Sequence, residues 1–294
     1  MAITDRLGRI GIWYPTQRFD AAGLRGFVRQ VEAFGYGTLW YPESTGYESL
    51  SQAAFMLGQS ERLMVGSSIA SIYARDAFTS RQGRMTLNAI SGDRFVLGLG
   101  VSHAPMVERL RGHHYGKPLT AMREYLELLD KDGKGLDAPG RTTVIAALGP
   151  RMLELARDRT AGAIPYNVTP EHTAEARAVL GPDKLLCVEQ KFCLEADAQT
   201  ALGLAKTELE RYMPLPNYRN NWLRLGFTEE ELSNGGNARF LSAMVAHGTE
   251  AAIQSVVEAH FAAGADHVCL QPVHAEGDVK SLSRMLAAFA PVAG

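Results

Sequence analysis

The chain has 294 residues, of which 46% are hydrophobic, and its formal net charge is −2. Because 30 Lys and Arg are balanced by 32 Asp and Glu, the sequence lacks the basic surface with which proteins bind nucleic acid. No stretch reaches the ~18 uninterrupted apolar residues that a membrane span needs. The three cysteines form no CxxC pair, so we expect buried thiols and a cytoplasmic protein.

Short apolar runs rich in β-branched residues alternate with segments that have the period of amphipathic helices. Residues 19–35, for example, place Leu24, Phe27 and Val31 on one stripe and end at Gly35, a typical C-cap. Eight such runs predict parallel strands at 9–14, 37–42, 62–69, 94–101, 142–148, 162–168, 185–195 and 267–273. We therefore expect one α/β domain, residues 1–294, folded as a (β/α)8 TIM barrel. Four methionines on apolar helical stripes are expected in the core: Met85, Met152, Met244 and Met285.

A long insertion at 197–248 separates the seventh strand from the next helix. It is far longer than one crossover needs, and it carries two prolines and a mixed aromatic and polar surface. Long segments on compact domains are commonly lids or binding loops, so we expect this insertion to cover the substrate site. An extra pair of helices packed on the barrel or at a subunit contact is the alternative.

The segment RFVLGLGVSHAP at 94–105 allows three interpretations. A dinucleotide fingerprint needs three glycines that open a helix, but here the third position is His103 and the first two glycines lie inside the strand. A serine-hydrolase elbow would use Ser102 with Asp266 and His267, yet those two begin a strand and so lie on the opposite face of a barrel. The mouth of the fourth strand is the interpretation we favour, since barrel active sites form at the carboxyl ends of strands.

The other strand ends supply a compatible pocket. The predicted strands one, two, three, five and six end in Trp13–Tyr14, Glu43–Ser44, Ser67–Ser71, Leu148–Arg151 and Tyr166–Thr169. This lining is aromatic and apolar with a few polar groups, which suits a large planar ligand better than a metal or a sugar phosphate. The sequence also shows no Lys and Arg cluster for a substrate phosphate, and the pair His113–His114 has no third metal ligand at a suitable spacing.

Nearly the whole chain resembles the bacterial-luciferase-like flavin and deazaflavin oxidoreductases, which are (β/α)8 barrels. The resemblance is strongest at 35–43, 65–105, 144–172 and 263–273. Within the family, the chain is most similar to the F-420-dependent subgroup. It implies coenzyme F-420 as the cofactor, with FMN as second choice, and a homodimer. It also implies a non-prolyl cis peptide between Ser68 and Ile69, in a bulge that presses against the cofactor ring.

The resemblance and the strand ends together predict the residues that contact the cofactor. They are Ser68, Ile69, Ala70, Val101, Ser102, Ala147, Leu148, Gly149, Pro150, Arg151, Tyr166 and Asn167. Arg151 starts a helix, where an arginine and free backbone N–H groups are suited to phosphate. On the substrate side we expect Tyr14, Ser44, Tyr218 and Trp222, although an aromatic residue can also simply fill the barrel mouth.

The chain departs from the family pattern at two places that matter for acid/base chemistry. Related sugar-phosphate dehydrogenases have an Asp-His pair where this chain has Glu43–Ser44, and a glutamate where it has His103. Histidine can shuttle a proton near neutral pH, so His103 is the candidate acid/base and Glu43 its orienting partner. Alternatively, His103 only caps the segment that follows it.

These observations predict an F-420-dependent oxidoreductase that transfers hydride between the deazaflavin and a small, fairly apolar organic substrate. An FMN-dependent luciferase-like monooxygenase is the nearest alternative, because the same barrel hosts both chemistries. A deazaflavin-binding carrier or sensor with little turnover is the alternative of another class.

Overall fold

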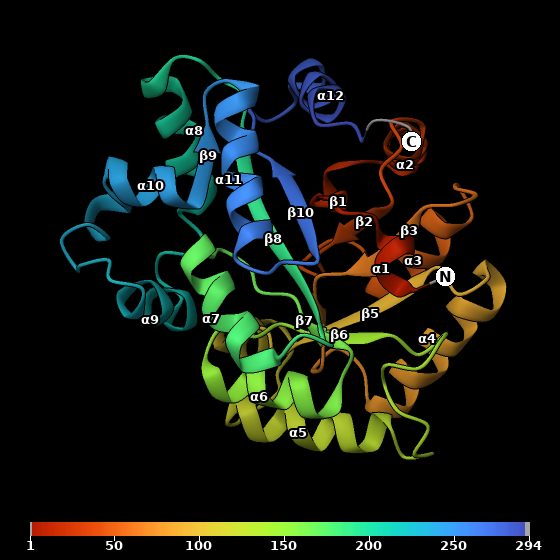
Figure 1. The fold of residues 1–294 in the computed structure, drawn as a ribbon. Helices are drawn as coiled ribbons and strands as arrows, with labels where there is room; N and C mark the ends of the chain where they lie inside the picture. The colour runs from red at the N-terminus through yellow and green to blue at the C-terminus, as the bar shows by residue number, and fades with distance from the viewer. Residues whose placement is uncertain (1, 292–294) are drawn as a thin grey trace.

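The computed structural model describes residues 2–291 and shows a closed parallel barrel with helices around it (Figure 1). The order of the barrel strands is β1-β2-β3-β5-β6-β7-β8-β10, and pairing of β10 with both β8 and β1 closes the ring. The eight predicted strands and the (β/α)8 fold are thus confirmed. The barrel strands are β1 (Ile10–Trp13), β2 (Thr38–Tyr41), β3 (Met64–Ser67), β5 (Phe95–Gly100), β6 (Thr143–Ile145), β7 (Gly162–Ala163), β8 (Leu185–Cys193) and β10 (His267–Pro272).

Helices follow the strands and bury one apolar face each against the sheet. In α2 (Ala21–Ala33) the side chain of Asp20 accepts the Gly23 N–H as an N-cap, and Leu24, Phe27 and Val31 are buried. The other outer helices are α3 (Ser49–Leu57), α4 (Ala77–Ser91), α5 (Pro118–Leu129), α6 (Pro150–Arg159), α7 (Pro170–Leu180), α11 (Glu250–Ala262) and α12 (Val279–Ala288).

The barrel interior is a separate apolar cluster, closed at its amino-terminal end by α1 (Ile3–Leu7). Leu7 is fully buried in this cluster together with Trp13 and Trp40. The cluster also takes in Cys187 and Cys269; both thiols are free, as is that of Cys193, and all three are buried, as predicted.

The segment between β8 and α11 forms a third apolar cluster on one side of the barrel (Figure 1). It contains α8 (Ala198–Leu209), α9 (Pro216–Arg224), α10 (Ala238–Met244) and the short strand β9 (Val245–His247). Strand β9 pairs with the end of β8 outside the ring, which the sequence pattern did not predict. Among residues 2–291, no helix is long and apolar enough to cross a membrane.

Candidate functional site

A cavity of about 640 Å³ opens at the carboxyl ends of the barrel strands. Its lining comes mainly from the ends of β1, β2, β3, β5, β6, β7 and β10 and from residues 208–218, which run from the end of α8 into α9. Twelve of the residues predicted for the site line it: Glu43, Ser44, Ser68, Ile69, Val101, Ser102, His103, Ala147, Leu148, Gly149, Tyr166 and Tyr218. The structure thus brings together most of the residues selected from the sequence.

One wall of the cavity is a bulge between β3 and the two-residue strand β4 (Ala70–Ser71). The peptide bond between Ser68 and Ile69 is cis, as the resemblance implied. The indole nitrogen of Trp13 donates to the Ser68 carbonyl at 3.3 Å, and the backbone N–H of Glu43 donates to the Ile69 carbonyl at 3.2 Å. Trp13, which sequence reasoning did not single out for this role, therefore helps to fix the bulge.

Two glycines of β5 make room for this bulge. A Cβ on Gly98 would lie 1.9 Å from the Ser67 carbonyl oxygen, and one on Gly100 would lie 2.5 Å from Cγ1 of Ile69. No real contact is that short, because carbon atoms meet at about 3.5–4.0 Å. The glycines of the GLG segment thus allow β3 and its bulge to pack closely against β5.

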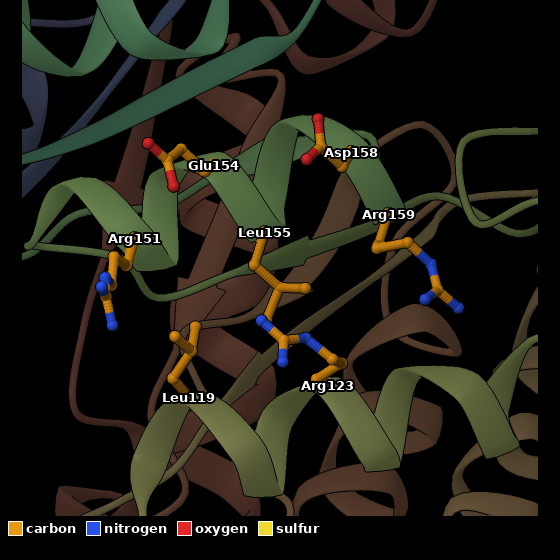
Figure 2. Close-up of a pocket in the computed structure, with 7 residues that line it drawn as sticks. All are labelled: Leu119, Arg123, Arg151, Glu154, Leu155, Asp158 and Arg159. Atoms are coloured by element: carbon orange, nitrogen blue, oxygen red, sulfur yellow. The ribbon is translucent and has the colours of Figure 1, made fainter.

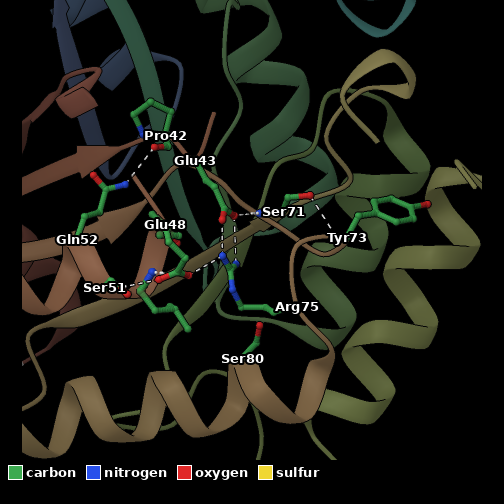
Figure 3. A network of polar contacts seen from close by, with 12 residues as sticks. Pro42, Glu43, Glu48, Ser51, Gln52, Ser71, Tyr73, Arg75 and Ser80 are labelled. Carbon is green, nitrogen blue, oxygen red and sulfur yellow. Dashed lines mark hydrogen bonds and ion pairs between the residues drawn. The ribbon is translucent and has the colours of Figure 1, made fainter. Parts of the chain in front are cut away.

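Glu43 takes part in a buried ion-pair network beneath the bulge (Figure 3). Its carboxylate pairs with the guanidinium of Arg75 and accepts the Ser71 N–H at 2.8 Å. The side chains of Glu43 and Arg75 are 4% and 8% exposed, and Arg75 also binds Glu48. Among the described residues Glu43 makes no hydrogen bond or ion pair with His103; its carboxylate is engaged by Arg75 and the Ser71 N–H at the base of the bulge.

His103 lies just after β5, and its ring packs beside the insertion. Ser102 adopts a φ of 56°, in the left-handed region, and this turn ends β5 and directs His103 toward the insertion. The imidazole lies 5.7 Å from the ring of Tyr218, centroid to centroid. Burial lowers the pKa of His103, and a hydrogen bond with Asn217 partly opposes that shift. The imidazole is consequently neutral near pH 7.

The backbone of His103 also serves the following segment. Its carbonyl accepts the N–H groups of Met106 and Val107 at 2.9 and 3.0 Å, at the start of the π-helical turn Met106–Leu110. The capping role is therefore carried by the backbone, and the imidazole is left facing the cavity.

The loop after β6 presents Leu148 and Gly149 to the cavity. The Leu148 carbonyl accepts a hydrogen bond from Nε2 of His172 at 2.8 Å, with the proton on that nitrogen, and Gly149 begins α6. Arg151 departs from its predicted place: its side chain lines an outer groove between α5 and α6 with Arg123 and Arg159 (Figure 2). One residue beyond Pro150, the helix has already turned that side chain away from the barrel mouth.

Four other predicted contacts also lie outside the cavity lining. Tyr14 is in the core, stacked on Phe19, and its hydroxyl bonds to His274 at 3.1 Å. Ala70 is fully buried in β4, and Pro150 is the first residue of α6. Trp222 is fully buried and stacks beneath Tyr218. It therefore supports a cavity residue without itself reaching the cavity.

Asn167 is buried as well, and it joins the barrel to the insertion. Its carbonyl accepts the Trp222 indole N–H at 3.1 Å, and its side-chain oxygen accepts from Nζ of Lys191 at 2.6 Å. Lys191 pairs with Glu189 at 3.1 Å and lies 3.7 Å from the ring centroid of Tyr166. Burial lowers the pKa of Lys191 and raises that of Glu189, while their attraction opposes both shifts.

A polar wall lies across the barrel mouth from the bulge, and of its members sequence reasoning predicted only Tyr166. It comprises Tyr166, Glu208, Arg211, Tyr212 and Gln271. The Tyr166 hydroxyl donates to Gln271 and pairs with the Tyr212 hydroxyl, both at 2.8 Å. Gln271 donates to Glu208 at 3.0 Å, and Arg211 donates to the other carboxylate oxygen of Glu208 at 2.5 Å. These residues come from β10, from the loop after β7 and from the insertion, so no local motif marks them.

Comparison with known proteins agrees with this geometry. A Mycobacterium tuberculosis protein that carries the name of a coenzyme F420-dependent oxidoreductase is 31% identical over 121 residues, which are 41% of this chain and 34% of that protein. The chain thus aligns with about a third of this relative's length.

Two solved structures share the fold along almost the whole chain. An F420-dependent secondary alcohol dehydrogenase matches with a TM-score of 0.73 and 10% identity, over 95% of this chain and 98% of that one. The oxygenating constituent of 3,6-diketocamphane monooxygenase from Pseudomonas putida, in complex with FMN, matches with a TM-score of 0.71 and 12% identity, over 96% of each chain. The family model described as luciferase-like monooxygenase matches residues 6–266, and the chain belongs to that family.

Proposed function

We propose that this protein is an F-420-dependent oxidoreductase that transfers hydride between the deazaflavin and a small, fairly apolar organic substrate. The observation that carries the proposal is a cavity with a fixed bulge on one wall and the side chain of His103 in its lining. The name of the mycobacterial relative and the F420 complex of the alcohol dehydrogenase support the same cofactor.

The cavity fits a planar tricyclic ring. Its volume of about 640 Å³ lies within the usual range of small-molecule sites, and Ile69, Val101 and Leu148 give it apolar faces. A Cβ on Gly149 would meet no atom within 4 Å, so the chain leaves open space beside this position. When bound there, F-420 would supply the hydride chemistry, and Ser68, Ile69, Val101, Ala147, Leu148 and Gly149 would hold its ring.

The role proposed for His103 is proton transfer with the substrate. A neutral imidazole can accept the proton of a substrate hydroxyl as hydride leaves the carbon, and can return it in the reverse direction. Asn217, which also lines the cavity, is the side chain whose hydrogen bonding raises the pKa of His103 against the effect of burial. Tyr218 and Ser44, which also line the cavity, would contact the substrate.

We further propose that the insertion covers this site and that the protein works as a cytoplasmic homodimer. The stretch from Glu208 to Tyr218 contributes side chains to the cavity wall, which supports the covering role. On α4, Phe78 and Met85 are 55% and 48% exposed and, seven residues apart, share one helical face; exposed apolar side chains of this kind support a subunit contact. The buried free cysteines fit a reducing compartment.

The first test is to titrate the purified protein with F-420 and with FMN in parallel, following ligand fluorescence. We expect F-420 to bind in the micromolar range or tighter and FMN to bind much more weakly. The opposite preference would replace the proposal with a flavin monooxygenase, and failure of both ligands to bind would overturn the cofactor assignment.

The second test separates an enzyme from a carrier. A panel of alcohols, ketones and enones is screened for a change in the redox state of F-420, and His103→Gln is compared with the unmodified protein. We expect turnover that His103→Gln reduces by about 10²- to 10⁴-fold while F-420 affinity is kept. Tight F-420 binding without turnover of any compound would favour a carrier or sensor.

A further inference from the structure

Two arginines that are distant in sequence share one carboxylate at the rim of the cavity. Arg211, at the end of α8, donates to Oε2 of Glu208 at 2.5 Å, and Nη2 of Arg18, from the turn after β1, lies 4.0 Å from the same oxygen. Glu208 is 9% exposed, and its other oxygen accepts from Gln271. The carboxylate therefore accepts two hydrogen bonds and one longer ion pair, and its single negative charge does not balance the two arginines.

The charges around the rest of the cavity cancel. On the bulge side, Arg75 and Arg111 face Glu43 and Glu48, so two positive charges meet two negative ones. His103 is neutral near pH 7, as argued above. At the polar wall, Lys191 and Glu189 cancel each other, whereas Arg18 and Arg211 share Glu208, and the balance is one positive charge.

Arg211 is positioned to bind a further group. Its guanidinium lies 5.5 Å from the ring centroid of Tyr212, and two of its nitrogens donate to Glu208, Nη2 to the carboxylate and Nε to the backbone carbonyl, so its direction is fixed. A guanidinium has five N–H donors in a fork that matches a carboxylate, and the contacts to Glu208 use only part of them. The side chain is 48% exposed and lines the cavity, which leaves the remaining donors accessible to a ligand.

We propose that Arg211, assisted by Arg18, binds a carboxylate on the substrate, so that the substrate class is a small organic acid with an apolar body. This inference rests on the proposed function, because it places the substrate beside the cofactor in the same cavity. The wall that holds Arg211 lies opposite the bulge: β7 and β10, which carry Tyr166 and Gln271 at their ends, flank the strand that faces β3 across the ring.

The experiment measures binding of benzoate and of benzamide, two probes of nearly equal shape and different charge, to F-420-loaded protein by calorimetry. We expect benzoate to bind about tenfold more tightly than benzamide, the effect of a charge-assisted hydrogen bond at a half-exposed site. Arg211→Gln should abolish this preference, and Arg18→Gln should reduce it. Arg219→Gln is the matched control, because Arg219 lies in the same insertion, pairs with Glu229 and does not line the cavity.

Equal binding of the two probes to the unmodified protein would overturn the inference, as would a preference that survives in Arg211→Gln. The anionic tail of F-420 is another source of the same chemistry, so affinity for F-420 is compared with affinity for the deazaflavin without its tail. If Arg211→Gln weakens only the tailed cofactor and leaves the benzoate preference intact, the arginine serves the cofactor and the inference is wrong. If F-420 itself does not bind, the proposed function fails first, and this inference falls with it.

Discussion

The substitution Gly100→Ala tests whether the glycines of β5 exist to accommodate the bulge. The new Cβ would lie 2.5 Å from Cγ1 and 2.7 Å from Cδ1 of Ile69. Since these contacts are about 1 Å too short, either the β5 backbone or Ile69 must move. Overpacking of this kind costs about 1–3 kcal/mol of the free energy of unfolding.

The expected change in melting temperature follows from the size of the chain. With an unfolding entropy of about 2.1 cal/mol/K per residue, the 294-residue chain should lose roughly 2–5 °C in Tm. Because Ile69 lines the cavity, its displacement should also weaken binding of F-420. Scanning calorimetry measures the first effect, and ligand fluorescence measures the second.

Two further variants make the result decisive. Gly203→Ala is the control: a Cβ at this α8 position meets no atom within 4 Å, so the protein should become more stable, by up to about 1 kcal/mol. The double variant Gly100→Ala/Ile69→Ala should cost clearly less than the sum of the two single changes, because the clash is relieved. Additive costs, or a Gly100→Ala protein as stable as the unmodified one, would refute the reasoning.

Three other predictions concern buried charge. Glu43→Gln should lower the free energy of unfolding in urea by about 1–3 kcal/mol, because Arg75 then keeps only its bond to Glu48. Glu48 is 49% exposed, so Glu48→Gln should cost less than about 1 kcal/mol, and equal costs would contradict this account. Lys191→Met should lower the free energy of unfolding by about 3–5 kcal/mol, because Glu189 is left buried without its partner, and adding Glu189→Gln should recover most of that loss. A double variant as unstable as the single one would count against a buried ion pair. Burial lowers the pKa of both His260 and His267 to about 4 in the folded state, below the ordinary 6.5, so the unfolded chain takes up protons first. Stability should be full above pH 6.5 and fall between pH 6.5 and 4, by up to about 3 kcal/mol per histidine, and His260→Gln should flatten that slope in pH-dependent urea titrations.

The barrel was predictable because its signal is local and repeated. Each strand is a continuous apolar run and each helix an amphipathic stripe, and both patterns can be read within a dozen residues. Strand ends were less accurate: the run predicted at 162–168 forms a ladder only at Gly162–Ala163, because the chain then leaves the sheet to build the cavity mouth. The cis peptide was expected from the family resemblance, and no pattern in the residues themselves indicates it.

Apart from Tyr166, the polar wall could not be predicted, since its other members look like ordinary surface residues in sequence. Glu208 and Arg211 have the spacing of an exposed helical pair, and only the fold brings them to Gln271 and Arg18. Met85 shows the opposite error: it lies on an apolar stripe and was expected in the core, but it is 48% exposed, whereas Met244 and Met285 are buried as predicted. Periodicity identifies a face of a helix and does not say whether the barrel or another surface covers it.

The two walls of the cavity are encoded in separate stretches of the chain. The bulge and the glycines that receive it lie within residues 64–100, while Glu208, Arg211, Tyr212 and Tyr218 all belong to the segment between β8 and α11. That segment forms its own apolar cluster, and polar contacts such as the Trp222–Asn167 and Gln271–Glu208 bonds join it to the barrel. Such a layout is modular. Replacing the segment between β8 and α11 can change which substrate the cavity accepts, while residues 64–100 keep the wall formed by the bulge.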